Sequence, residues 1–229
     1  MIPLPVRLPR LAGLGGWSDD PLWASFYDWT VEHPLRGGLV WRAGVHSDLS
    51  RLYRAAAEIG CLPAGSRVLD VPCGGGVALR GLRPGQDVEY VAADIAQAML
   101  DRTMRAAERR GVADQVTPRI ADVGDLPFDD GSFDLVVSFT GLHCFPDPRT
   151  AVAEMARVLR PGGVLTGSAL LNDTGLVYEP LRRVGRIAGL MGPGCRTTDL
   201  EDWLGDGGVD DVVVDVSGAI AYFRGVRRG

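Results

Sequence analysis

The sequence predicts an α/β fold in which helices cover both faces of a mostly parallel sheet. From Ser66 onward, short apolar runs typical of strands alternate with amphipathic segments typical of helices. The first run ends in a carboxylate at Asp70 and passes into a glycine cluster, and the second ends in a carboxylate at Asp94. Acids and glycines at the ends of neighbouring strands predict a nucleotide-like ligand across the carboxyl edge of the sheet.

Composition limits the class of protein. With 229 residues, 46% of them hydrophobic and 23% charged, the chain is long enough for one domain with a large core. A net charge of −5 provides no overall attraction for nucleic acid or an anionic membrane. The four cysteines form no CxxC pair and have no histidine at metal-ligand spacing, so we expect no metal site, no disulfide framework and a cytoplasmic location.

The N-terminal region differs in character from the rest. Residues 1–16 are apolar but interrupted by three prolines, which predicts an extended arm rather than a signal peptide or a membrane span. Asp19-Asp20-Pro21 is typical of a helix start, and an aromatic-rich helix should follow over 22–32. Apolar residues spaced three and four apart predict a second helix over 42–59.

The remaining elements follow from periodicity and from Gly and Pro breaks. We predict strands at 66–71, 88–93, 116–121, 133–138 and 162–170, and helices at 75–82, 95–110 and 148–159. After residue 172 we predict an amphipathic helix over 176–190, a short helix opened by the capping-box spacing of Thr198 to Glu201, and two antiparallel strands at 209–216 and 219–226. Arginines clustered near residues 102–110 and 182–186 are interpreted as solvated helix faces.

The glycine spacing separates two classes of cofactor. A dinucleotide fingerprint needs a third small residue, but counting from Gly74 and Gly76 that position is Leu79. Asp70 beside the loop would repel a pyrophosphate, whereas it suits a ligand that carries an ammonium group. S-adenosylmethionine has that ammonium and a cationic sulfonium, and Asp94 at the second strand end suits its ribose diol. A nicotinamide-dependent reductase is therefore disfavoured.

Residues 66–167 resemble the class I S-adenosylmethionine-dependent methyltransferases, in the branch that includes quinone-biosynthesis-type and many small-molecule enzymes. The first family motif, V-L-D-x-G-x-G-x-G, corresponds to Val68-Leu69-Asp70-Val71-Pro72-Cys73-Gly74-Gly75-Gly76. Four further segments match in order: Asp94-Ile95, Ala121 to Phe128, Phe133 to Ser138, and Glu154 to Gly163. The resemblance implies a Rossmann-like, seven-stranded sheet in which the C-terminal strand pair inserts antiparallel beside the fifth strand.

The resemblance also implies roles for individual residues. Asp94 would bind the ribose, Ile95 would pack on the adenine, and Asp122 with the Val123 backbone would contact the adenine amino group. The other cofactor-binding candidates come from the glycine loop, the fourth-strand motif and the N-terminal helix: Asp70, Cys73, Gly74, Gly76, Ser138 and Tyr27. Tyr27 would cover the methionine end of the cofactor, or serve as a core residue.

One position departs from the family pattern. Pro72 stands where the family has its first glycine, and proline supplies no N–H donor. We therefore expect the loop to hold the cofactor through its donors from Cys73 onward.

His143 is the candidate catalytic residue. It follows the fourth predicted strand, and an imidazole suits a general base that deprotonates an acceptor. The alternative is a loop histidine that is hydrogen-bonded to backbone and shapes the pocket.

These features predict an S-adenosylmethionine-dependent methyltransferase for a small, hydrophobic organic acceptor. Residues 1–65 would form an arm and helices covering the active site, and residues 66–229 the core, with a lid or substrate insertion at about 174–207. The alternative is a protein of this fold that binds the cofactor but catalyses another reaction or acts as a sensor. We expect neither nucleic acid nor membrane insertion, and a monomer or homodimer.

Overall fold

The computed structural model describes residues 21–229, with side chains from Ser25 onward; the expected arm at 1–16 and the Asp19-Asp20 signal lie outside this part. One sheet has the strand order β3-β2-β1-β4-β5-β7-β6. Its strands are β1 Arg67–Asp70, β2 Glu89–Asp94, β3 Val116–Ile120, β4 Phe133–Phe139, β5 Leu159–Leu170, β6 Val209–Ser217 and β7 Ile220–Arg227. The first five are parallel, and β7 runs antiparallel to both β5 and β6, which confirms the predicted fold class.

Helices cover both faces of the sheet because the central strands are apolar on both sides. On one face, α4 Leu49–Ala56 and α5 Gln97–Arg110 contribute to a core that includes Leu52 and Leu100. On the other face, α6 Pro148–Arg157 and α8 Thr197–Asp206 contribute Met155 and Leu200 to a second core. Short 3₁₀ turns complete the connections: η1 Ile59–Cys61, η2 Val77–Arg80, η3 Ala113–Gln115 and η4 Leu142–Cys144.

The N-terminal region contains one more helix than the sequence indicated. The predicted helix at 22–32 is α2 Pro21–Glu32, but the predicted helix at 42–59 is wrong as a single element. It is divided into α3 Pro34–Val45 and α4, because His46 adopts a left-handed φ of 52° and ends α3. Asp48 then accepts the backbone N–H of Ser50 at 2.9 Å and begins a new helix.

The predicted helix at 75–82 is reduced to the single turn η2. Gly76, with φ 85°, delays its start. At its end Gly81 lies so close to α4 that a Cβ there would fall 1.8 Å from the Ala56 carbonyl oxygen. Close packing on α4 and the following Pro84 therefore leave no room for a longer helix.

The segment after β5 forms η5 Leu176–Tyr178 and α7 Glu179–Ile187 in place of one continuous helix. The predicted capping residues of α8 are shifted by two positions, because the Asp199 carboxylate accepts the backbone N–H of Arg196 at 2.8 Å. The interpretation of the clustered arginines as solvated is wrong for Arg182. Arg182 is 2% exposed and donates to Glu179 and to the carbonyl oxygens of Leu171 and Gly175.

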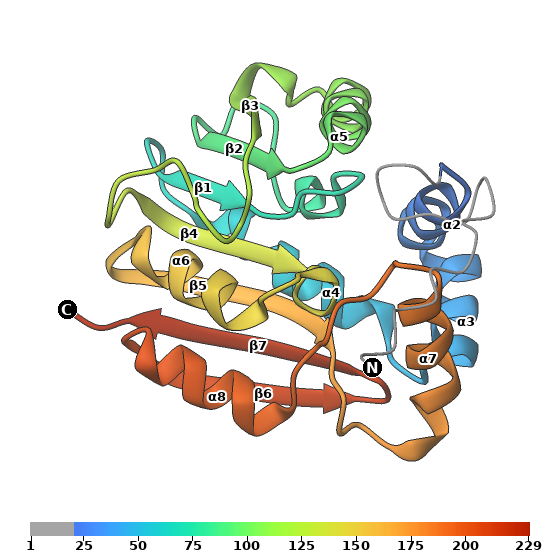
Figure 1. Ribbon diagram of the computed structural model, residues 1–229. Helices are drawn as coiled ribbons and strands as arrows, with labels where there is room; N and C mark the ends of the chain where they lie inside the picture. The colour runs from blue at the N-terminus through green and yellow to red at the C-terminus, as the bar shows by residue number, and fades with distance from the viewer. Residues whose placement is uncertain (1–20) are drawn as a thin grey trace, which may run out of the picture.

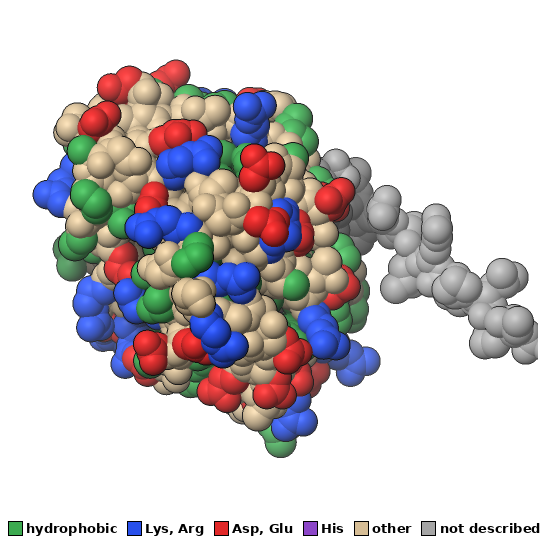
Figure 2. Space-filling view, turned by 90° about the vertical axis from the view of Figure 1, so that its left-hand side faces the viewer, with side chains coloured by type: hydrophobic (Ala, Val, Ile, Leu, Met, Phe, Trp, Pro, Cys, Tyr) green, Lys and Arg blue, Asp and Glu red, His purple; other side chains and the backbone are tan. Residues whose placement is uncertain are grey.

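The arrangement leaves one edge of the sheet for a site. In Figure 1, α2, α3 and α7 gather at the end to which β1, β2 and β4 point. The opposite, amino-edge side carries arginines interspersed with acids (Figure 2). None of the helices in residues 21–229 combines the length and apolar character needed to cross a membrane.

Candidate functional site

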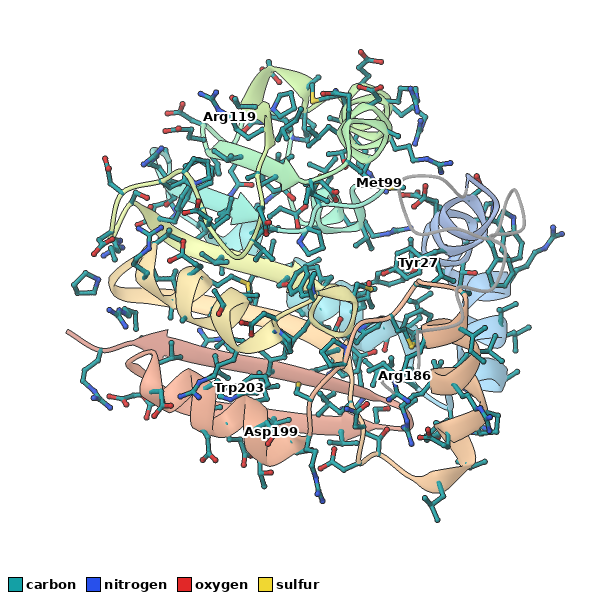
Figure 3. All side chains as sticks on the ribbon, in the orientation of Figure 1. Tyr27, Met99, Arg119, Arg186, Asp199 and Trp203 are labelled. Carbon is teal, nitrogen blue, oxygen red and sulfur yellow. The ribbon has the colours of Figure 1, made fainter. Side chains whose placement is uncertain are left out.

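A cavity of about 360 Å³ lies at the carboxyl ends of β1, β2 and β4. Its walls come from the glycine loop, from the residues that follow β2, β3 and β4, and from α2. Seven predicted site residues line it: Tyr27, Cys73, Gly74, Asp94, Ile95, Asp122 and Val123. Asp70, Gly76, Ser138 and His143 do not. In Figure 3, Tyr27 lies between α2 and the strand ends, and Met99 lies at the start of α5.

The glycine loop is held in place by its own backbone hydrogen bonds. The Cys73 N–H donates to the Ala93 carbonyl at 2.9 Å, and the Gly74 N–H donates to Asp94 Oδ2 at 3.1 Å. The expectation that donors from Cys73 onward serve the ligand is therefore wrong for these two groups, which join the loop to β2. Gly74 adopts a positive φ of 52°, which glycine tolerates without strain.

Pro72 is accommodated by a glycine from another part of the chain. The Val71–Pro72 peptide is cis. A Cβ on Gly141 would fall 2.2 Å from Pro72 Cδ and 3.1 Å from the Phe145 ring. The proline ring therefore packs directly on the loop that follows β4, and only glycine fits opposite it.

Asp94 and Ile95 present contrasting chemistry at the end of β2. The Asp94 side chain accepts N–H bonds from Gly74 at 3.1 Å and from Ala96 at 3.0 Å, and the residue is only 6% exposed. Burial raises the pKa of Asp94, while these backbone donors lower it. Ile95 beside it is 69% exposed, so the cavity has an apolar surface next to a fixed carboxylate.

Asp122 and Val123 lie at the start of the loop after β3. Asp122 is exposed and accepts the Gly124 N–H at 2.8 Å, whereas Val123 is buried. Together with Ile95 they form the side of the cavity beyond β2.

Asp70 lies beneath the glycine loop and outside the cavity. It is 1% exposed, and the Tyr90 hydroxyl donates to Asp70 Oδ2 at 2.6 Å. Burial raises the pKa of this carboxyl to about 7, with Tyr90 acting in the opposite direction. Gly76 packs against Thr103 and Ala106, and Ser138 is fully buried, with no hydrogen-bond partner for its hydroxyl in the described part of the chain.

Among the cavity residues that escaped the sequence analysis are Thr140 and Asp28. Thr140, directly after β4, has a left-handed φ of 54°, which is strained for a β-branched residue. Its hydroxyl lies 2.7 Å from the Tyr27 hydroxyl, and burial raises the Tyr27 pKa. Asp28, on α2, is paired with Arg102 of α5 at 2.8 Å. Asp28 could have been noticed in the sequence as an acid beside Tyr27. Its pairing with Arg102 could not, because the two residues lie 74 positions apart in the sequence.

His143 lies beside β5 rather than at the cavity. Its Nδ1 accepts the backbone N–H of Leu170 at 3.2 Å, and its carbonyl accepts the Gly192 N–H at 2.9 Å. Burial lowers the imidazole pKa to about 4, so the ring is neutral near physiological pH. The base role and the pocket-shaping role both stay predictions, but this geometry favours the second.

The apolar side chains of the segment after β5 do not face the cavity. Leu176, Val177, Val184 and Ile187 are 58–89% exposed, and only Gly189 of the 174–207 segment lines the cavity. The lid or substrate insertion expected at about 174–207 therefore brings none of these four side chains to the cavity.

Comparison with known proteins agrees with this geometry. Residues 69–166 match the family model described as a methyltransferase domain. The chain is 37% identical over 123 residues to the 27-O-demethylrifamycin SV methyltransferase of Amycolatopsis mediterranei, covering 53% of this chain and 44% of that protein. It is 40% identical over 114 residues to the demethylmenaquinone methyltransferase of Clavibacter sepedonicus, covering 49% and 45%. The chain spans about half the length of the curated relatives it matches.

The solved YcgJ protein of Bacillus subtilis has the same fold, with a TM-score of 0.63 at 17% identity over 79% of this chain and 99% of that one. The fold and the site thus define a Rossmann-like methyltransferase domain. The methyltransferase match over residues 69–166 and the methyltransferase relatives agree with the resemblance to class I, the S-adenosylmethionine-dependent class, that the motifs indicated.

Proposed function

We propose that this protein transfers a methyl group from S-adenosylmethionine to a small, largely hydrophobic organic acceptor. The observation that carries the proposal is the cavity at the strand ends, where a fixed carboxylate, an exposed apolar residue and the glycine loop meet within a methyltransferase domain. Its volume of about 360 Å³ lies in the range of small-molecule sites. The residues present therefore fit the cofactor.

The proposed contacts follow from the lining residues. Asp94 would accept the ribose hydroxyls, Ile95 would pack on the adenine ring, and Asp122 with the Val123 backbone would face the adenine amino group. Cys73 and Gly74 would form the floor beneath the cofactor. Asp70, Gly76 and Ser138 would support that floor from below, because none of them reaches the cavity.

When bound, the cofactor supplies an electrophilic methyl group on a cationic sulfonium. The chain's own contribution would be to align the acceptor and exclude water, which is an effective means of lowering a bimolecular barrier. Phe139 and Phe145, which line the cavity, suit an apolar acceptor. Tyr27 and Thr140 would close the cavity on the α2 side, where residues up to 65 would act as a cover.

The relatives named above are methyltransferases of 27-O-demethylrifamycin SV and of demethylmenaquinone, and their names support an organic acceptor. We propose a monomer or homodimer in the cytoplasm, with no nucleic acid partner and no metal requirement. The four free thiols and the interspersed surface charges support this.

Calorimetry tests the first step. We expect S-adenosylmethionine and S-adenosylhomocysteine to bind without added metal, and a chelator to leave the affinity unchanged. No heat of binding with either ligand at millimolar concentration would contradict the proposal. Methyl transfer to a panel of hydroxylated aromatic acceptors, followed by mass spectrometry, then separates catalysis from a sensor role.

His143→Ala is expected to change turnover by less than about tenfold, because the imidazole is turned toward the Leu170 N–H and away from the cavity. Loss of a general base would instead cost roughly 10²- to 10⁴-fold. The measurement is kcat from pH 5 to 9 with cofactor affinity in parallel. A large, pH-dependent loss with unaltered cofactor affinity would show that His143 is the base. Tyr27→Phe, at the cavity itself, is the comparison variant.

A further inference from the structure

The ammonium group of the proposed cofactor is a cation that a carboxylate would stabilise, and the cavity offers three carboxylates. Asp94 already accepts two backbone N–H groups at the end of β2. Asp122 lies beyond β2 on the opposite side of the site. The third is Asp28, which reaches the glycine loop from α2. Asp70, to which the sequence assigned the ammonium, is beneath the loop and hydrogen-bonded by Tyr90.

The two oxygens of Asp28 face different groups. Oδ2 accepts from Arg102 Nη1 at 2.8 Å. Oδ1 lies directly over Gly75, since a Cβ added to that glycine would fall 1.9 Å from it. Gly75 is therefore needed to admit this carboxylate to the loop. The Asp28 side chain is 26% exposed, and the residue borders both the main cavity and a smaller one of about 180 Å³.

We propose that Asp28 binds the ammonium group of the cofactor's amino acid part, with Arg102 as its positioning residue. The inference rests on the proposed function, because it requires an adenosyl amino acid in the cavity. A carboxylate partly removed from water interacts more strongly with a cation than an exposed one does. Arg102 anchors one oxygen and leaves the other directed at the loop.

Asp28 lies among charges of both signs, because Arg102, Arg105 and Arg109 border the smaller cavity together with Asp28 and Glu32. Burial raises the Asp28 pKa, and the Arg102 guanidinium lowers it. A second cation above Gly75 would stabilise the ionised carboxylate further. On the same helix, one turn later, Glu32 pairs with Arg110 at 2.9 Å and borders only the smaller cavity. Two similar ion pairs thus join α2 to α5, and one of them reaches the main cavity.

Binding measurements with two ligands test the proposal. The first is S-adenosylhomocysteine, and the second is 5′-S-(3-carboxypropyl)thioadenosine, which is identical except that it lacks the amino group. We expect Asp28→Asn to weaken the first ligand about 10- to 100-fold, as for the loss of one charge-assisted hydrogen bond. Binding of the second should change by less than about threefold.

Glu32→Gln is the matched control, because it removes the same charge from the same helix face without altering the main cavity. We expect it to leave the affinities of both ligands within about threefold of those of the wild type. Circular dichroism melting of each variant checks that α2 stays folded onto the core. If Asp28→Asn does not fold, Asp28→Ser provides the second variant.

Three outcomes would overturn the inference. Equal weakening of both ligands by Asp28→Asn would mean that Asp28 only holds α2 in place. No weakening would mean that another group, such as Asp70, meets the ammonium. Equal affinity of the wild type for the two ligands would mean that no carboxylate recognises the amino group. Failure of the wild type to bind either ligand would instead reject the proposed function itself.

Discussion

Asp94→Ala is expected to weaken the binding of S-adenosylmethionine by about two orders of magnitude or more. The substitution removes two proposed charge-assisted hydrogen bonds to the ribose, each worth roughly 1.5–3 kcal/mol. It also leaves the N–H groups of Gly74 and Ala96 without their acceptor, so the loop loses one of the two hydrogen bonds described above that join it to β2. Isothermal titration calorimetry of the apo protein measures the change.

The matched control is Asp134→Ala, which changes an acid at the amino end of β4. Asp134 accepts the Arg67 backbone N–H at 2.7 Å and lies outside the cavity. We expect this variant to lose some stability but to keep its cofactor affinity. An unchanged dissociation constant in Asp94→Ala would show that the ribose is held by other groups.

Asp70→Asn is expected to make the apo protein more stable above neutral pH. The ordinary pKa of an aspartate is about 3.9, and burial raises that of Asp70 to about 7 in the folded protein. Between these two pH values Asp70 keeps its proton in the folded state but has lost it in the unfolded state. The free energy of unfolding therefore falls as the pH rises. The total loss is on the order of 4 kcal/mol, at 1.36 kcal/mol for each pH unit.

Urea unfolding at pH 5 and pH 8 measures this effect. In the wild type, the contribution of Asp70 to the free energy of unfolding is retained near pH 4 and is lost by about pH 7. For Asp70→Asn, the free energy of unfolding should depend less on pH. Tyr90→Phe should make the free energy of unfolding fall more steeply with pH, because the Tyr90 hydroxyl lowers the Asp70 pKa in the wild type. Parallel pH profiles for the wild type and Asp70→Asn would show that Asp70 is ionised throughout this range.

Much of the fold could be predicted because its signals are local. Alternating strands and helices, the breaks at glycine and proline, and the C-terminal strand pair depend on residues close together in the sequence. The acid at the end of β2 and the apolar residue after it could be located for the same reason. Parallel strands bring their carboxyl ends to one edge, so the motif order alone indicated where the ligand would lie.

The helix boundaries were less predictable because they depend on competing contacts. The break between α3 and α4 results from one left-handed residue, His46, and from the Asp48 cap. The shortening of η2 results from the contact of Gly81 with α4. Apolar periodicity continues across both positions. A prediction from periodicity alone therefore gives one helix in place of α3 and α4 and a helix longer than η2.

The class of domain, its parallel core and the residues at the strand ends follow from the sequence. Which of those residues reach the cavity depends on the tertiary structure. Asp70 and Asp94 look equivalent in the sequence, yet Asp70 turns beneath the loop to Tyr90 while Asp94 faces the ligand side. Asp28 reaches the loop because α2 packs on α5 through ion pairs between residues 74 and 78 positions apart. Such pairing depends on how the helices are placed in space, and no local pattern of residues records it.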